Sequence, residues 1–157
     1  MTNEPSIQPA HARSRDRLET LFGPAPSASE LYIIEARSRR RLQRAVDIFA
    51  ANAMTTADVA ALLGLSPASV LRQRQAGRLI AVRRGREWFY PRWQFHDGAP
   101  LPRLPELIGA WSGAALELAN WAVTRNVDLN ERRPAHVWRR DPEKVLAEIA
   151  AMNALVW

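Results

Sequence analysis

Apolar residues recur at helical spacing from Leu31 onward, which predicts a helix that begins at its N-cap Ser29. The same helix carries five arginines between positions 37 and 44. A helix with one apolar stripe and a basic remainder covers its own core, packs on a neighbouring domain or forms a dimer seam. Of these we expect the first. The apolar positions are Leu31, Ile34, Leu42, Ala45, Val46 and Phe49.

Two shorter helices joined by a glycine turn are predicted next. Thr55 or Thr56 is the expected N-cap of the first, with Asp58 in its first turn and Val59, Leu62 and Leu63 facing inward. A small residue, a turn glycine and an inward apolar residue then follow at the spacing that packs two short helices together. These three residues are Ala60, Gly64 and Val70.

The second of these helices is expected from about Pro67 to Ala76, with Ser66 as its N-cap and Gly77 as its stop. Two β-rich runs, 79–82 and 88–90, then flank a turn with Gly85 at its tip. Either Trp88 and Tyr90, or Phe89, are expected to pack one face of the hairpin. This order of helix, turn, helix and hairpin is typical of a winged helix-turn-helix, whose second helix enters a DNA groove.

Basic charge gathers on this same segment. The net charge is +6, and residues 37–92 alone hold twelve arginines and three acidic residues. A double-stranded DNA operator is therefore the predicted nucleic-acid partner. Ser69, Arg72 and Gln73 are expected to reach base edges, because arginine reads guanine and glutamine reads adenine. The full set of candidate DNA-binding residues is Ser66, Ser69, Arg72, Gln73, Arg74, Arg83, Arg84 and Arg86.

Composition changes after the hairpin. Trp93 and Phe95 are expected core anchors, and a segment rich in proline and glycine at about 96–104 predicts a boundary or hinge. Helices are expected over 104–111, 113–125 and 134–139, and a last one opens at Asp141-Pro142. We therefore expect a mainly α fold: a flexible segment 1–28, a DNA-binding domain 29–95 with a small β-hairpin wing, and a helical domain 104–157. Within the first segment, residues 1–13 are expected to be disordered and 15–22 to form a short helix.

Residues 114–150 resemble the C-terminal toxin-binding domain of the Xre/MbcA/ParS antitoxins. The matching residues are Trp121, Asn126, Leu129, Pro134, Val145 and Ile149. The family often has a glycine in the loop before the proline, whereas this chain has none between 130 and 133. The helix-turn-helix with its basic wing is more similar to the MerR or excisionase kind than to the helical Xre kind. The resemblance implies an antitoxin that neutralises a RES-type toxin, which is an enzyme that consumes NAD. It also implies that the antitoxin represses the operon that it shares with the toxin.

If the resemblance holds, the helices at the C-terminal end contact the toxin. Arginine and tryptophan are frequent interface anchors. The terminal tryptophan is expected either to dock in a partner or to fold back on its own core. The candidate partner-binding residues are Arg132, Arg133, Trp138, Arg139, Arg140 and Trp157. A homodimer, or a hetero-oligomer with the toxin, is also expected.

The composition gives less support to a metal-binding protein, an enzyme or a membrane protein. The chain has no cysteine, its three histidines are scattered, and it lacks paired catalytic carboxylates and a glycine-rich phosphate loop. We therefore expect no metal site, no cofactor and no enzyme activity. No apolar run suggests a signal peptide or a membrane span, so a cytoplasmic protein is expected. The alternative function is a stand-alone transcriptional regulator of the MerR or excisionase kind, whose C-terminal helices serve dimerisation.

Overall fold

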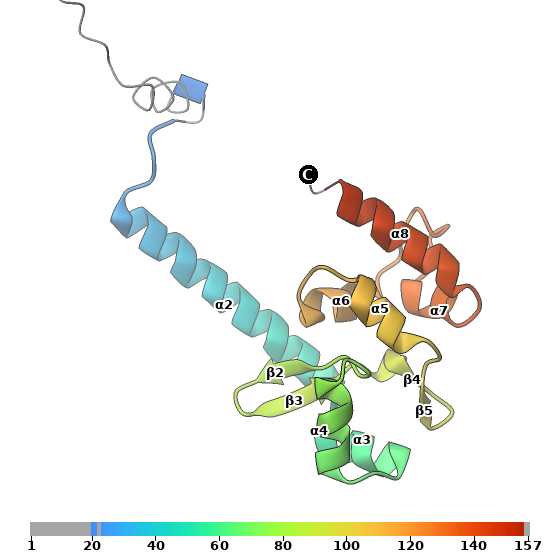
Figure 1. Cartoon of the computed structure of the whole chain (residues 1–157). Helices are drawn as coiled ribbons and strands as arrows, with labels where there is room; N and C mark the ends of the chain where they lie inside the picture. The colour runs from blue at the N-terminus through green and yellow to red at the C-terminus, as the bar shows by residue number, and fades with distance from the viewer. Residues whose placement is uncertain (1–19, 22, 156–157) are drawn as a thin grey trace, which may run out of the picture. The chain divides into compact units, whose positions relative to one another are not determined.

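The computed structural model describes residues 20–21 and 23–155, and it is mainly helical with a small antiparallel sheet between the helices (Figure 1). The predicted fold class is confirmed. The structure divides into two compact units, residues 1–42 and 43–157. The expectations for residues 1–13, for most of 15–22 and for Trp157 lie outside the described residues.

Helix α2 (Ala28–Asn52) contributes to both units. It begins two residues earlier than predicted, because Ser27 rather than Ser29 caps it: the Glu30 amide donates to Ser27 Oγ at 3.3 Å. In return the Ser27 backbone amide and hydroxyl donate to the Glu30 carboxylate, which lowers the pKa of that carboxyl. Ala50 is the buried residue of this helix, whereas Leu31 and Leu42 are exposed. The expectation that the helix covers its own core is therefore wrong for residues 28–42, whereas Ala45, Val46 and Phe49 further along are half-buried.

Helices α3 (Thr56–Leu63) and α4 (Pro67–Gln75) pack together as predicted. Gly64 ends α3 in the left-handed conformation, at φ 65°, and its amide donates to the Ala60 carbonyl. Ala60 and Val70 are buried between the helices. These contacts confirm the turn expected from Ala60, Gly64 and Val70. The expectation that Leu62 faces inward is wrong, because 39% of this residue is exposed.

The hairpin belongs to a three-stranded antiparallel sheet of β1 (Met54–Thr55), β3 (Glu87–Tyr90) and β2 (Val82–Arg84), in that order. Gly85 lies at the tip, at φ 61°. The first predicted strand was placed too early, since residues 79–81 form a buried approach to β2 rather than part of it. Met54 pairs with Tyr90, so the sheet joins the start of α3 to the base of the wing.

After the sheet, a 3-10 turn η1 (Arg92–Gln94) leads into a second small hairpin of β4 (Phe95–His96) and β5 (Ala99–Pro100). Gln94 is fully buried, and its amide exchanges two hydrogen bonds of 2.8 Å with the backbone N–H and C=O of Ile80. The backbone carbonyl of Gln94 accepts a hydrogen bond from the Leu101 backbone amide at 2.8 Å. Gln94 thus fastens the approach to the wing to the segment that leads into the C-terminal helices.

Four further helices complete the unit: α5 (Leu104–Ala110), α6 (Ala115–Trp121), α7 (Pro134–Trp138) and α8 (Pro142–Ala154). Asp141 caps α8 as predicted, and α6 is shorter than expected. One hydrophobic core includes Val59 and Val70 of the helix-turn-helix as well as Leu104 and Ile149 of the C-terminal helices. Residues 54–149 are therefore built around a common interior.

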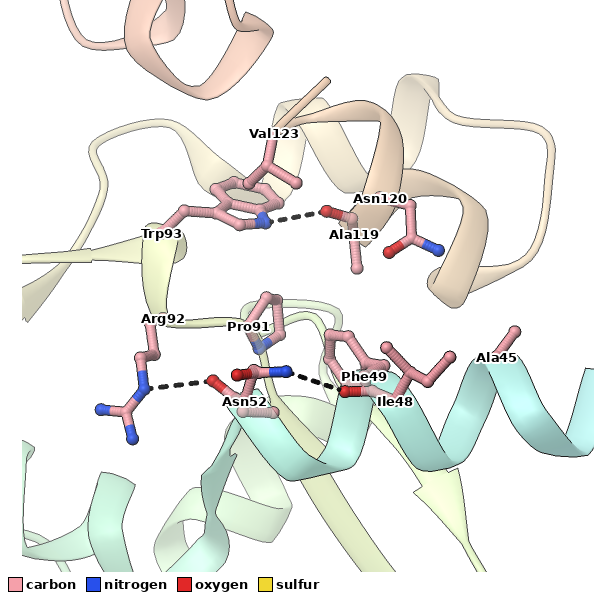
Figure 2. A pocket seen from close by; sticks show the side chains of 11 residues that line it. Ala45, Ile48, Phe49, Asn52, Pro91, Arg92, Trp93, Ala119, Asn120 and Val123 are labelled. Carbon is pink, nitrogen blue, oxygen red and sulfur yellow. Dashed lines mark hydrogen bonds between the residues drawn. The ribbon is translucent and has the colours of Figure 1, made fainter.

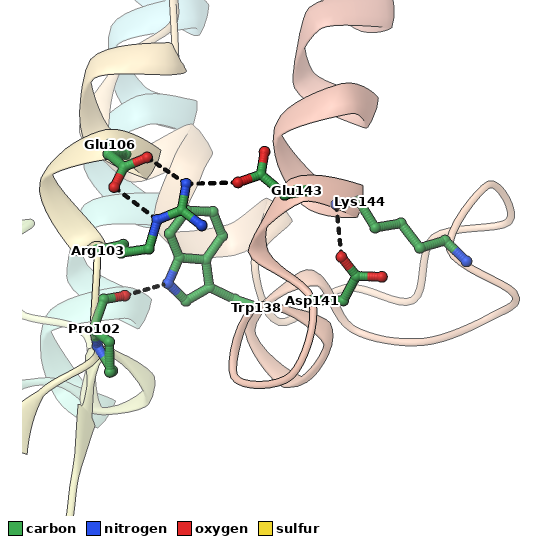
Figure 3. Close-up of polar contacts among 7 residues, drawn as sticks. All are labelled: Pro102, Arg103, Glu106, Trp138, Asp141, Glu143 and Lys144. Atoms are coloured by element: carbon green, nitrogen blue, oxygen red, sulfur yellow. Dashed lines mark hydrogen bonds and ion pairs between the residues drawn. The ribbon is translucent and has the colours of Figure 1, made fainter.

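Trp138 joins these helices to the rest of the core (Figure 3). Only 1% of it is exposed, and its indole N–H donates to the Pro102 carbonyl at 2.9 Å. Above it, Arg103 forms ion pairs with Glu106 at 2.6 Å and Glu143 at 2.8 Å, which link α5 to α8. Hydrogen bonding to the two carboxylates raises the pKa of Arg103, and the Arg103 guanidinium lowers the pKa of Glu106.

The N-terminus of α3 allows a test of pH-dependent stability. The Thr55 amide donates to the Asp58 carboxylate at 2.8 Å, and the Asp58 amide donates to Thr55 Oγ1 at 3.1 Å. The backbone hydrogen bond, with that of the Thr55 side chain, lowers the pKa of Asp58 from its ordinary 3.8. A lowered folded-state pKa stabilises the protein above the unfolded-state value, and this stabilisation is lost as the pH falls through the folded-state pKa.

We therefore expect Asp58→Ala to lower the melting temperature at pH 7, with a difference from the wild type that shrinks below about pH 4. Thermal unfolding between pH 2.5 and pH 7 measures this difference. Asp128→Ala, which removes an exposed aspartate from a loop, is the matched control. A difference that stays constant over this range would contradict the role of the ionised carboxylate.

Candidate nucleic-acid interface

The first turns of α4 carry a connected row of polar side chains. Ser66 Oγ accepts from the Ser69 amide at 3.1 Å and donates to Ser69 Oγ at 2.9 Å. An Arg72 Nη atom donates to the same Ser69 oxygen at 2.8 Å. Residues three apart on a helix share a face, so Ser66, Ser69 and Arg72 lie along one side of α4. In helix-turn-helix proteins, the N-terminal residues of this second helix usually contact the bases, and these three residues lie at that end of α4.

Arg74 is arranged differently. Its guanidinium lies 3.8 Å from the ring centre of Trp88 on β3, a cation–π contact between α4 and the wing. Its Nε atom is buried and has no hydrogen-bond partner among the described residues. Much of Arg74 is therefore engaged in holding the wing against the helix. Gln73, on the same turn, is half-buried.

The three wing arginines differ in how free they are. Arg83 bends back, so that its Nε donates to the Gly85 carbonyl at 2.9 Å. Arg84 pairs through its Nε with Asp47 of α2 at 2.8 Å. Arg86 is exposed and makes no ion pair with any other residue that the structure describes. It borders a hollow of about 400 Å³ together with Thr55 and Thr56 at the start of α3. Of the three, Arg86 is the one for which the described residues provide neither an ion pair nor a hydrogen bond to the wing backbone.

Sequence reasoning missed two positioning residues at this site. Asp47 lies 37 residues before its wing partner Arg84, on a helix whose apolar pattern does not predict a contact with the wing. Trp88 was expected to pack the hairpin, but not to hold an arginine of α4. Alternation along β3 places Trp88 and Tyr90 on the same side of the hairpin, and this pattern was the available signal for Trp88. For Asp47 no local pattern was available, because its contact with Arg84 arises only when the chain folds.

The predicted partner-binding residues occupy a different surface. Arg132, Arg133, Arg139 and Arg140 are all exposed. Trp138, the last residue of α7, does not join them on the surface, because only 1% of it is exposed, so this candidate partner-binding residue lies in the core. A partner that approaches this surface therefore meets arginines and not the indole ring.

Comparison with known proteins agrees with this geometry. Residues 53–97 match a family of helix-turn-helix domains, over the stretch that runs from β1 to the first residues after the wing. The searches of curated proteins and of solved structures gave no match. Among the described residues, no helix is both long enough and apolar enough to cross a bilayer. The chain thus contains a helix-turn-helix domain of DNA-binding regulators, formed by residues 53–97.

Proposed function

We propose that this protein is the antitoxin of a type II toxin–antitoxin pair. It binds and neutralises a RES-type, NAD-consuming toxin through its C-terminal helices, and it represses its own operon by binding operator DNA in the cytoplasm. Binding, and not catalysis, is its activity. The helix-turn-helix domain supports the DNA-binding part. The resemblance of residues 114–150 to the toxin-binding domain of the Xre/MbcA/ParS antitoxins supports the other part.

One observation carries the toxin-binding proposal: the residues behind that resemblance belong to one packed set of helices. Leu129, Val145 and Ile149 are each 1% exposed. Asn126 accepts from the Leu129 amide at 3.2 Å and donates to Glu148 at 3.3 Å, so it closes the loop over α8. A shared packing role is what a common fold requires of these positions.

The loop also explains how the chain does without the family's glycine. Asn130 and Glu131 both adopt the left-handed conformation, at φ 56° and 58°. Glycine enters this region without strain, and asparagine does so more readily than most residues. The backbone therefore keeps the turn that a glycine would favour. An Asn126–Arg132 bridge then directs the chain toward Pro134 and α7.

A stand-alone regulator of the MerR or excisionase kind is the second candidate. The common core of residues 54–149 favours it, because the C-terminal helices help to bury the helix-turn-helix. In that case α5 to α8 would serve stability or dimerisation and would need no toxin. The two candidates share the DNA-binding interface and differ at the exposed arginines on either side of α7, Arg132, Arg133, Arg139 and Arg140.

The decisive experiment is affinity purification of the full chain from its host, with the co-purifying proteins identified by mass spectrometry. A stoichiometric partner that is toxic alone and harmless with this chain would support the antitoxin. The double variant Arg139→Glu, Arg140→Glu should then lose the partner, while Arg78→Glu, at an exposed arginine that follows α4, should retain it. Recovery of the chain with DNA and no such partner would favour the stand-alone regulator.

For base reading, we expect Arg72→Ala to weaken binding to the selected operator by about 1–3 kcal/mol and to relax preference at one base pair. The operator is first obtained by selection from random duplexes with the wild-type protein. Arg72→Lys is the matched variant, because lysine keeps the charge and loses the fork that reads guanine. Equal losses on operator and random DNA, restored by lysine, would make Arg72 a phosphate contact instead.

For the wing, we expect Arg86→Ala to make the slope of log binding constant against log salt shallower by about one unit. Arg84→Ala should change the slope less, because Asp47 already neutralises part of its charge. Fluorescence anisotropy with a labelled duplex at 50–300 mM salt measures all the slopes. Arg125→Ala is the control and should leave the slope unchanged. A larger change for Arg84 than for Arg86 would contradict the assignment.

A further inference from the structure

Helix α2 carries apolar side chains that the rest of the described chain does not cover. Among the described residues, six of the eleven large apolar side chains that are exposed lie on this helix. In proteins most of the stability of a helix comes from packing of its apolar face on another surface. The six are Leu31, Tyr32, Ile33, Ile34, Leu42 and Ile48.

These side chains continue a stripe that ends in a groove. With 3.6 residues per turn, one face of α2 carries Leu31, Ile34, Ser38, Leu42, Ala45, Phe49 and Asn52. The last three of these line a groove of about 580 Å³, together with Ile48 on the same helix. Figure 2 shows Pro91 and Trp93 on the neighbouring segment, and Ala119 of α6 with Val123 just beyond its end, on the other sides of it. The lining is mostly apolar, and the Trp93 indole N–H is already bonded to the Ala119 carbonyl at 3.2 Å.

The geometry points to a second copy of this chain as the occupant, with the two α2 helices antiparallel and crossing at Ser38. In this arrangement Leu31 of one copy lies level with Ala45 of the other and enters its groove, and Ile34 lies level with Leu42. Each contact occurs twice, as a two-fold interface requires. The small Ser38 at the crossing lets the helices approach closely.

Charge selects this orientation over the parallel one. Parallel helices would place the five arginines of positions 37–44 beside the same five in the other copy. The antiparallel pair keeps only Arg37 and Arg39 level with each other, sets Glu35 level with Arg41, and moves Arg44 beside Tyr32. Glu35 also pairs with Arg39 of its own helix at 3.6 Å. Opposite charges at adjacent positions are favourable, and like charges are repulsive by a similar amount. The segment 1–19 is a poorer occupant, since Ile7 and Leu18 are its only large aliphatic residues after Met1.

Light scattering and analytical ultracentrifugation of the full chain test the proposal first. We expect a dimer at micromolar concentration, and Ile34→Lys should raise its dissociation constant at least about a hundredfold. Val123→Lys, at the rim of the groove, should also weaken the dimer. Ile33→Lys is the matched control, because Ile33 is exposed on the same helix but off the stripe, and this variant should stay dimeric. A monomeric wild type, or dissociation by Ile33→Lys and not by Ile34→Lys, would overturn the proposal.

Orientation has its own test, because the natural chain contains no cysteine. Ser38→Cys should form a disulfide-linked dimer on mild oxidation, since the two copies meet at this position. Leu31→Cys should not, because the two cysteines of an antiparallel pair lie about 21 Å apart along the axis. Cross-linking of both variants would indicate a parallel pair and refute the antiparallel arrangement. The inference needs neither toxin nor operator, so its failure would leave the proposed function standing.

Discussion

Replacement of Trp138 by alanine is expected to lower the free energy of unfolding by about 3–5 kcal/mol, the range for removing a large buried aromatic ring. The free energy of unfolding of a typical domain is only about 5–15 kcal/mol, so this loss is a large fraction of it. Two contributions add: the indole fills the core, and its N–H satisfies the Pro102 carbonyl at 2.9 Å. Urea unfolding followed by circular dichroism measures the change.

Trp138→Phe separates the two contributions, because phenylalanine keeps most of the apolar volume and loses the N–H. We expect it to cost about 1–3 kcal/mol, since it also leaves the carbonyl unpaired. The pair of variants also decides between two roles for this residue. If Trp138→Ala lost partner binding while its unfolding curve matched the wild type, the tryptophan would be an interface anchor and not a core residue.

Replacement of Gln94 by alanine is expected to cost about 2–6 kcal/mol, because it leaves both the N–H and the C=O of Ile80 buried and unpaired at about 1–3 kcal/mol each. Gln75→Ala is the matched control: the same change at an exposed glutamine of α4 should stay within about 0.5 kcal/mol. Equal effects of the two variants would mean that water replaces the lost bonds. The same unfolding measurement at pH 7 applies.

Gln94→Glu adds a sharper test. A glutamate keeps the acceptor for the Ile80 amide, but its ionised form has no proton to donate to the Ile80 carbonyl. Burial raises the pKa of such a carboxyl above its unfolded-state value. Stability from the protonated form is then present at low pH and lost as the pH rises. We therefore expect the variant to be closer to the wild type at pH 4 than at pH 7, and a difference that does not depend on pH would contradict this.

Local rules predicted the helix-turn-helix well. The N-caps Thr55 and Ser66, the left-handed Gly64 and the stop at Gly77 each depend on a few neighbouring residues, and all four are confirmed. The start of α2 failed for an equally local reason: two serines compete as caps, and the Glu30 side chain reaches back to Ser27. The spacing of the apolar residues indicated that a helix begins near residue 29, but it did not identify the residue that caps it.

Long-range packing was beyond the sequence pattern. Trp138 follows two arginines and a histidine in a basic stretch, so nothing nearby marks it as the residue that inserts beneath Pro102. Val123 shows the opposite case: it lies within the helix predicted over 113–125, but α6 ends at Trp121 and leaves it 43% exposed. The specific DNA contacts stay predictions, since they depend on a duplex.

The common core has a consequence for evolution and engineering. Many regulators exchange their specificity by recombining a DNA-reading segment with a new effector segment, which requires a seam that few contacts cross. Here Gln94, Leu101 and Trp138 bind the two sides of the 97–103 connection together. A chimera joined there would expose Val59 and Leu104 alike. A transplant of the helix-turn-helix would then have to carry residues 54–149, which share this core, as one piece.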